Sequence, residues 1–321
     1  MKRFSALVVT ALLVAGAASA ENMHLARGVP QGPAHIGFAT DFQALNPGLK
    51  DEQWGFRIGG FGGISSGAAR THVPVIFVHG NNVDAADWYP VQDDFRVANW
   101  TDQELWALSY NGLGGSNGSA LFTANPRRDQ EHTDMGWDGQ TRVTSNEVNV
   151  PDLYNFILAV RAYTGSNRFS IVSHSLGVTL ARRTLKVHPE LRADLVAFVG
   201  IAGGNEGTTF CPPGSEPLVE SCDEIAAGTP WLWDLNHNAD GSWDETYSPA
   251  RWMTVYDGTG AGDPAYVGPT YAQSPSLDGA VNCVFPGTYH NDLRMDPAIV
   301  AVYRAFLEAA DGGIPRTDCA A

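Results

Sequence analysis

The sequence predicts an α/β fold in which helices cover both faces of a central, mostly parallel sheet. Short apolar runs alternate with segments of helical periodicity along much of the chain. The apolar runs are hydrophobic at successive positions, so both of their faces should be buried, as in strands of a parallel sheet. Glycine-rich turns follow several of the runs, at the carboxyl edge of such a sheet where active sites lie.

Each predicted element can be located from its own pattern. The candidate strands are Val73–Val78, Leu105–Tyr110, Phe169–Val172, Leu195–Ile201, Trp252–Tyr256 and Ala280–Phe285. The candidate helices are a segment that Pro151 opens and Gly165 ends, the segment Val178–Val187, and a last helix that Pro297 opens. Because strands and helices alternate along the chain, the connections should be the crossovers of a parallel sheet.

The first twenty residues have the layout of a signal peptide. Lys2 and Arg3 precede an apolar run from Leu7 to Ala15, and small residues follow up to Ala20. The apolar run is too short to span a bilayer, and polar sequence follows it. We therefore expect a secreted chain, extracellular or periplasmic, that begins at Glu21 and has no stable membrane insertion.

Residues 21–321 are expected to form one domain, because α/β folds of this size are commonly single domains with insertions. Residues 204–250 are long for a connection and hold Trp231, Trp233 and Trp243 among glycines, prolines and acids. This irregular, Trp-rich insertion is predicted to form a cap or wall over the site. A passive surface excursion is the alternative.

The charge of the chain excludes one class of partner. The formal net charge is -15, and it becomes -17 when Lys2 and Arg3 are removed with the leader. A surface this acidic repels phosphate backbones, so we expect no nucleic acid partner. No feature of the sequence indicates an oligomeric state.

The four cysteines predict two disulfides, because their number is even in a chain that is expected to be exported. Pairing the cysteines nearest in sequence joins Cys211 to Cys222 and Cys283 to Cys319. A zinc site is the alternative, but no pair has the close Cys-x-x-Cys spacing.

Ser175 is the candidate nucleophile. It stands in the segment Ser173-His174-Ser175-Leu176-Gly177, directly after a predicted strand and before a predicted helix. A sharp turn between strand and helix exposes a serine hydroxyl, and small residues two positions before and after it allow close packing. Serine replaces the usual leading glycine at position 173. The alternative is that Ser175 only caps the helix.

Two backbone amides are candidates for an oxyanion hole. One belongs to Leu176, directly after the candidate nucleophile, and the other to Asn81, which follows an early strand through the turn His79-Gly80. Donors at these two places stabilise the negative charge that develops on a carbonyl oxygen during acyl transfer. For His79 we expect a structural role, with its ring bonded to nearby backbone.

His290 is the candidate base and Asp263 the candidate acid. Hydrolases with this strand–turn–helix signature place serine, acid and histidine in that chain order, and His290 follows the last predicted strand. Asp257 and Asp263 both follow the strand that ends near Tyr256. Asp263 is favoured because an acid several residues beyond the strand can reach the imidazole, while Asp257 stays open as the alternative at the strand tip.

No cofactor and no catalytic metal are expected. The segment Asp234–Glu245 partly matches a calcium-binding loop, with Asn236, Asn238 and Asp240 among its oxygen-bearing residues. Ala239 stands where the turn glycine of that loop belongs, so a run of turns with Asn and Asp side chains is favoured over calcium.

With these motifs the chain resembles the secreted lipase-like polyhydroxybutyrate depolymerases and, more distantly, small bacterial lipases of the α/β-hydrolase superfamily. The matching stretches are Pro74–Asn81, Ala162–Leu185, Phe198–Gly204 and Gly287–His290. The resemblance implies an α/β-hydrolase fold, a triad of Ser175, Asp263 and His290, and an oxyanion hole at Asn81 and Leu176.

The function expected from the residues and the resemblance is that of a serine carboxylic-ester hydrolase, a lipase or esterase that forms an acyl-Ser175 intermediate with an ester lipid. One alternative is an extracellular depolymerase of polyhydroxyalkanoate or synthetic polyester, with the tryptophans and Tyr110 holding the polymer. A second alternative is a secreted binding protein on an inactive hydrolase scaffold.

Overall fold

The computed structural model describes residues 37–46, 60–63, 70–81, 83–110, 134–135, 141–142, 146–212, 220–247 and 249–320. All of them belong to one unit, His35–Ala321. The expected signal peptide, residues 1–20, lies outside the described residues.

A seven-stranded sheet forms the centre of this unit, in the order β1-β3-β2-β6-β7-β8-β9. Its strands are β1 (Gly60–Phe61), β2 (Val75–Val78), β3 (Leu105–Leu108), β6 (Phe169–His174), β7 (Leu195–Ile201), β8 (Arg251–Tyr256) and β9 (Val281–Val284). Only β1 runs antiparallel to its neighbour in this sheet, and the other pairs are parallel. A separate antiparallel pair is formed by β4 (Asp134–Met135) and β5 (Thr141–Arg142).

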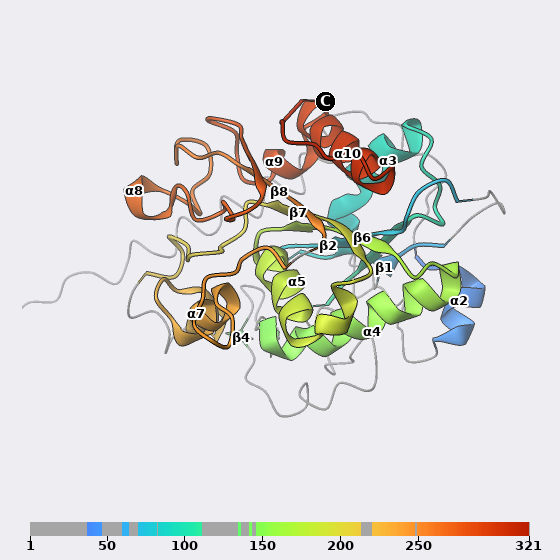
Figure 1. Ribbon diagram of the computed structural model, residues 1–321, viewed down its shortest axis with the longest axis horizontal. Coiled ribbons are helices and arrows are strands. Elements are labelled where there is room, and N and C mark those ends of the chain that lie inside the picture. The colour runs from blue at the N-terminus through green and yellow to red at the C-terminus, as the bar shows by residue number, and fades with distance from the viewer. Residues whose placement is uncertain are drawn as a thin grey trace, which may run out of the picture. The chain divides into compact units, whose positions relative to one another are not determined.

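Helices cover both faces of the sheet (Figure 1). One face carries η1 (Ala85–Trp88), α3 (Tyr89–Val97), α9 (Asp292–Met295) and α10 (Pro297–Asp311). The other carries α2 (Thr40–Leu45), α4 (Asn146–Thr164) and α5 (Leu176–Val187). The remaining short helices are η2 (Pro189–Leu191), α6 (Glu220–Ile225), α7 (Pro230–Asn236) and α8 (Gly268–Tyr271).

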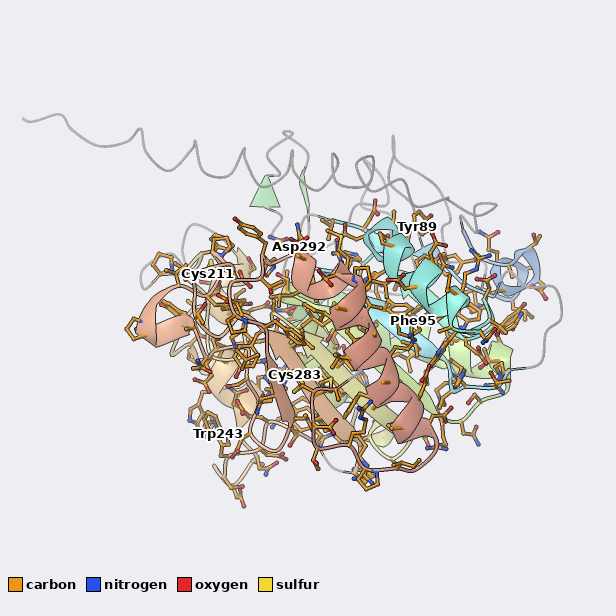
Figure 2. All side chains as sticks on the ribbon, turned by 90° about the horizontal axis from the view of Figure 1, so that it is seen from above. Tyr89, Phe95, Cys211, Trp243, Cys283 and Asp292 are labelled. Atoms are coloured by element: carbon orange, nitrogen blue, oxygen red, sulfur yellow. A yellow bond between two sulfur atoms is a disulfide. The ribbon has the colours of Figure 1, made fainter. Side chains whose placement is uncertain are left out.

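The sheet has a hydrophobic core on each of its two faces, because side chains alternate between the faces along every strand. In β2, Phe77 packs on one face against Phe95, at a ring-centroid distance of 5.7 Å, while Ile76 and Val78 belong to the opposite core. On the first face Phe95 of α3 also packs beside α10 (Figure 2), with its ring 6.1 Å from that of Tyr303. Apolar side chains on both faces are why the strands have unbroken hydrophobic sequences.

The six strands predicted from apolar runs all form, and so do the helices predicted after Ser175 and from Pro297. The predicted start of α4 at Pro151 is wrong, because the helix begins at Asn146 and Pro151 lies inside it. Glu224 of α6 explains the earlier start. Its carboxylate accepts hydrogen bonds from the backbone N–H groups of Asn146 and Glu147, at 2.6 and 2.9 Å, and so caps the helix from a distant part of the chain.

The two predicted disulfides are confirmed, Cys211–Cys222 and Cys283–Cys319. The insertion is less irregular than the sequence indicates, since α6 and α7 lie within it and α7 packs beside α5 (Figure 1). A guanidinium nitrogen of Arg182 on α5 donates to Asn236 Oδ1 of α7 at 2.8 Å. None of the helices in the described part of the chain is long and apolar enough to cross a membrane.

Candidate active site

Ser175 lies in the sharp turn between β6 and α5. Its backbone has φ 55° and ψ -127°, a left-handed value of φ that a residue with a side chain rarely adopts. The turn is held by the Ser175 N–H, which donates to Ile201 of β7 at 2.8 Å, and by the Ser175 carbonyl, which accepts from Val178 at 3.0 Å. Strain of this kind concentrates at functional sites, where the surrounding structure maintains it.

The small residues around Ser175 are required by close packing against β2. A Cβ on Gly177 would lie 2.3 Å from the carbonyl oxygen of His79, which is backbone and cannot rotate away. Ser173 replaces the glycine of the usual motif without strain, because its buried hydroxyl donates to the Val199 carbonyl at 3.1 Å. The departure from the motif is therefore accommodated by a hydrogen bond within the sheet.

The turn after β2 lies against the turn that carries Ser175. Its geometry depends on His79, whose Nδ1 donates to the Gly80 carbonyl at 2.7 Å while Nε2 accepts from the Tyr110 N–H at 3.2 Å. Tyr110 stacks on the ring at 4.1 Å and donates its hydroxyl to the His79 carbonyl at 2.5 Å. Both ring nitrogens thus bond backbone, which matches the structural role expected for this histidine. A Cβ on Gly80 would lie 3.0 Å from Cβ of Ser175, so the chain segment before Asn81 touches the nucleophile turn.

Asp263 and His290 are hydrogen-bonded to each other. His290 Nδ1 donates to Asp263 Oδ2 at 2.7 Å, and the Asp263 side chain is 1% exposed. The second oxygen, Oδ1, accepts from the Ala265 N–H at 2.9 Å, which fixes the orientation of the carboxylate. Because Nδ1 carries the proton toward Asp263, Nε2 is the ring nitrogen that can accept a proton.

His174 connects this pair to the nucleophile turn. Its Nε2 donates to the His290 carbonyl at 3.1 Å, and the two rings lie 4.7 Å apart. Burial, together with the nearby His290 ring and Arg294, lowers the pKa of His174 well below its usual value. His174 is therefore a neutral donor that precedes Ser175 in sequence and holds the backbone of His290. Sequence reasoning assigned it no role, and its position next to Ser175 was the only available signal.

Asp257, the alternative acid, has its carboxylate turned to backbone. Oδ1 accepts from the Gly287 N–H at 2.5 Å and from the Thr259 hydroxyl at 2.7 Å, while Oδ2 accepts from the Gly262 N–H at 3.2 Å. Burial alone would raise the pKa of Asp257, but these hydrogen bonds lower it below its usual value. The carboxylate that meets His290 is that of Asp263.

Exposed apolar side chains lie on the loops around this pair. Phe210 is 63% exposed, Val267 45% and Tyr289 67%, and Tyr289 directly precedes His290. The loop that carries Phe210 is hydrogen-bonded to the loop that carries Asp263, since the Thr209 N–H donates to the Ala265 carbonyl at 2.9 Å. These three residues form what we call the apolar rim.

A second group of exposed aromatic residues lies in the insertion. Trp233 stacks on His237 at 4.4 Å, and His237 meets Trp243 edge-on at 4.7 Å. Figure 2 shows Trp243 well away from Asp292, which stands two residues after His290. Trp243 thus lies apart from the segment that carries the candidate base. The expectation that Tyr110 holds a polymer is wrong, because Tyr110 is buried against the His79 ring.

The partial calcium motif folds as a turn. Asp240 Oδ1 accepts from both the backbone N–H and the hydroxyl of Ser242, at 2.9 and 2.6 Å. Within the described ranges, no three His, Cys, Asp or Glu side chains are grouped so that they could hold a metal ion.

Comparison with known proteins identifies a family and a large number of structural relatives, two of which are described below. The model of the family Lipase (class 2) matches residues 72–123 and 133–249, which is more than half of the chain. No curated protein matches the chain significantly.

The structure is similar to the mature form of Bacillus licheniformis lipase BlEst2, with a TM-score of 0.50 and 12% identity over 77% of this chain and 96% of that one. It is also similar to Aspergillus fumigatus lipase B, with a TM-score of 0.52 and 17% identity over 89% of this chain and 67% of that one. At these identities the likeness shows the fold alone, and the predicted α/β-hydrolase fold is confirmed.

Proposed function

Because the chain belongs to the lipase (class 2) family and is a carboxylic ester hydrolase, we propose that it cleaves ester lipids through an acyl-enzyme intermediate on Ser175. The observation that carries the proposal is the Asp263–His290 hydrogen bond of 2.7 Å, on loops that His174 joins to the nucleophile turn. In this proposal the chain is an active enzyme rather than an inactive binding scaffold.

The proposed reaction gives each of these side chains one task in acyl transfer. Ser175 Oγ attacks the ester carbonyl while His290 Nε2 takes its proton, and Asp263 holds the ring in the tautomer that leaves Nε2 as acceptor. The same proton then passes from Nε2 to the departing alcohol. Water repeats the sequence on the acyl-serine, releases the carboxylic acid and restores the serine.

The backbone amides of Asn81 and Leu176 are proposed to bind the oxyanion. Leu176 is the first residue of the twelve-residue helix α5, whose unpaired N–H groups and dipole favour negative charge at that end. Asn81 follows the Gly80 contact with Ser175, so its amide is the natural second donor. Such donors stabilise the transition state more than the uncharged ester, which is what catalysis requires.

The apolar rim supports an ester lipid as the substrate class. Phe210, Val267 and Tyr289 expose hydrophobic surface beside the candidate acid and base, where it would contact the acyl chain of a bound ester. Burial of acyl methylene groups against such side chains contributes about 0.8 kcal/mol each.

The test of this proposal is a serine substitution with a matched control. Ser175→Ala should abolish hydrolysis of short acyl esters and of tributyrin, and should prevent labelling by a fluorophosphonate probe, while circular dichroism stays unchanged. Ser173→Ala, two residues away, removes a hydroxyl that bonds only the Val199 carbonyl and should retain labelling and turnover. Turnover by Ser175→Ala at the wild-type rate would refute the acyl-Ser175 mechanism. Absence of labelling in the wild-type protein would favour the binding scaffold.

Export from the cytosol belongs to the same proposal. Two disulfides are typical of proteins that fold in an oxidising compartment. Mass spectrometry of the protein secreted by its native host should give an N-terminus at Glu21 and no free thiol. A cytosolic protein that retains residues 1–20 would contradict this part of the proposal.

A polyester substrate is the second candidate, and the exposed Trp233 and Trp243 are the observation that favours it. Aromatic faces at a distance from the site could hold an insoluble chain while another segment of it is cleaved. Activity on polyhydroxybutyrate and synthetic polyester films should then fall in Trp233→Ala and Trp243→Ala, with tributyrin hydrolysis unchanged. If films stay intact while tributyrin is cleared, this candidate is wrong.

A further inference from the structure

The candidate acid Asp263 and the candidate base His290 stand on two loops that extend beyond the regular part of the sheet. We call them the acid loop and the base loop. Pairing of β8 with β9 ends at Tyr256 and Val284, followed by one hydrogen bond from the Phe285 N–H to the Tyr256 carbonyl at 2.8 Å. Asp263 lies seven residues beyond Tyr256, and His290 lies six residues beyond Val284. Strand pairing therefore does not determine how the two loops lie relative to each other.

The loops touch each other through backbone at one junction. A Cβ on Gly262 would lie 2.3 Å from the carbonyl carbon of Gly287 and 2.5 Å from the carbonyl oxygen of Thr288. No side chain fits between the loops at this point. Gly262 directly precedes the candidate acid, and Gly287 stands three residues before the candidate base.

The Asp257 carboxylate joins the two sides of this junction. It accepts the Gly287 N–H of the base loop at 2.5 Å and the Gly262 N–H of the acid loop at 3.2 Å, one on each oxygen. The Asp263 N–H approaches Oδ2 at 3.5 Å, and the Thr259 hydroxyl donates to Oδ1 at 2.7 Å. Asp257 is 2% exposed, so water does not compete effectively for these donors.

A carboxylate suits this junction better than any other side chain of the same size. Every group that faces Asp257 in these bonds is a donor, and an ionised carboxylate is acceptor-only, with several lone pairs on its two oxygens. Hydrogen bonds from backbone N–H groups to an ionised oxygen are about twice as strong as those between neutral groups. An Asn side chain would present its NH₂ group to donors on one side and could not hold both loops.

We propose that Asp257 is a positioning residue that sets the orientation of Asp263 toward His290 by clamping the acid loop to the base loop. It touches neither the substrate nor the reacting atoms, and it acts through the two loops that do. The inference rests on the proposed function, because it assumes that Asp263 and His290 carry the reaction.

The principal test is Asp257→Asn, compared with Asp240→Asn as the matched control. Asp240 also accepts a backbone N–H and a hydroxyl within a turn, but all its partners belong to Ser242 and it is exposed. We expect kcat of Asp257→Asn to fall about 10²-fold, as for a misplacement of catalytic groups by about 1 Å, with KM changed less than about twofold. The control should behave as wild type.

The readout separates positioning from a merely structural role. Rates are normalised to active sites by titration to completion with a fluorophosphonate, and circular dichroism establishes the folded fraction. If the active fraction falls but kcat per labelled site stays at the wild-type value, Asp257 is only structural and the proposal is overturned. A folded Asp257→Asn with wild-type kcat would overturn it equally.

Thr259→Val gives a second route if Asp257→Asn does not fold. This substitution removes one donor to Asp257 Oδ1 and leaves the carboxylate in place. The expected loss of kcat per labelled site is about fivefold, the factor that corresponds to one hydrogen bond of about 1 kcal/mol. If Asp257→Asn does not fold and Thr259→Val keeps the wild-type kcat, the proposal that Asp257 clamps the two loops is overturned.

The two proposals fail in different ways. An active Ser175→Ala refutes the acyl-serine mechanism whatever Asp257→Asn does. An inactive, unlabelled Ser175→Ala together with a fully active Asp257→Asn refutes the clamp alone.

Discussion

The nucleophile side and the acid–base side of the candidate site are built in different ways. Ser175 stands between a six-residue strand and a twelve-residue helix, and backbone hydrogen bonds to neighbouring elements hold its turn. Asp263 and His290 stand on loops, where side chains make the decisive contacts. Regular secondary structure therefore positions the candidate nucleophile, and individual side-chain hydrogen bonds position the candidate acid and base.

This difference indicates where the site can be disturbed. A side chain added at Gly177 in the nucleophile turn must push apart packed backbone segments, whereas a substitution in the loops can change the site by removing a single hydrogen-bond acceptor. Loops with few regular hydrogen bonds also open at lower free energy than core strands. We therefore expect the acid–base side to be the more sensitive to conservative changes of polar atoms.

The largest effect is expected from Asp263→Asn on the acid–base side. An amide cannot hold the Nδ1–H tautomer of His290 as the carboxylate does, so kcat should fall about 10⁴-fold with the fold intact. Steady-state hydrolysis of a soluble ester measures the loss. If Asp263→Asn keeps more than a tenth of the activity and Asp257→Asn loses more, Asp257 is the acid.

On the nucleophile side, Gly177→Ala should disrupt the packing of the nucleophile turn between β6 and α5. Its Cβ must displace the His79 carbonyl, which lies 2.3 Å away, and with it the turn that carries Asn81. We expect kcat to fall about 10²-fold and stability to fall by about 1–3 kcal/mol. The control is Gly312→Ala, where the nearest atom is 3.5 Å from an added Cβ. If Gly177→Ala and Gly312→Ala had the same kcat and the same stability, this explanation of the packing at the nucleophile turn would be wrong.

His174 joins the two sides, so His174→Phe should have an intermediate effect. The phenyl ring keeps the volume but cannot donate to the His290 carbonyl. Loss of one hydrogen bond of about 1 to 1.5 kcal/mol predicts a decrease of kcat by about tenfold at most, with KM unchanged. Unchanged kcat in a folded variant would show that the two sides are placed independently.

The disulfides should affect stability rather than kcat. Cys283–Cys319 spans 36 residues and Cys211–Cys222 spans 11, so loop-closure entropy predicts losses of about 4 and 3 kcal/mol when each pair is replaced by serine. Denaturant unfolding of both double variants measures the difference. If loss of Cys211–Cys222 lowered the free energy of unfolding more than loss of Cys283–Cys319, native contacts of the insertion would contribute more to stability than chain entropy does.

The smallest effect concerns pH. Burial lowers the pKa of His174 in the folded state, whereas the unfolded chain should titrate near the usual 6.5. Below that pH the unfolded state binds a proton that the folded state does not, so stability should decrease as pH falls. His174→Phe should weaken this dependence below about pH 6.5 in melts recorded across pH. If stability changes with pH to the same extent in the wild type and in His174→Phe, His174 is not the source of the pH dependence.

The features of this protein that depend on local pattern can be predicted from its residues alone. The apolar runs located the strands, and the Ser175 segment located the turn between β6 and α5. The even number of cysteines predicted two disulfides, and the choice to pair the nearest ones in sequence, one of three pairings that four cysteines allow, agrees with the structure. The strand and turn patterns extend over a few neighbouring residues, so the chain displays them directly. The catalytic roles of Ser175, Asp263, His290, Asn81 and Leu176 stay predictions.

The pairs of polar groups that meet depend instead on how distant segments of the chain pack together. Glu224 caps α4 across 78 residues, His174 bonds His290 across 116, and Asp257 holds Gly287 across 30. The chain order favours Asp263 and leaves Asp257 open, whereas in the structure Asp257 faces backbone amides and Asp263 an imidazole. The physical reason is that a hydrogen bond depends on atomic positions within a few tenths of an ångström, which loop packing sets and hydrophobic periodicity does not encode.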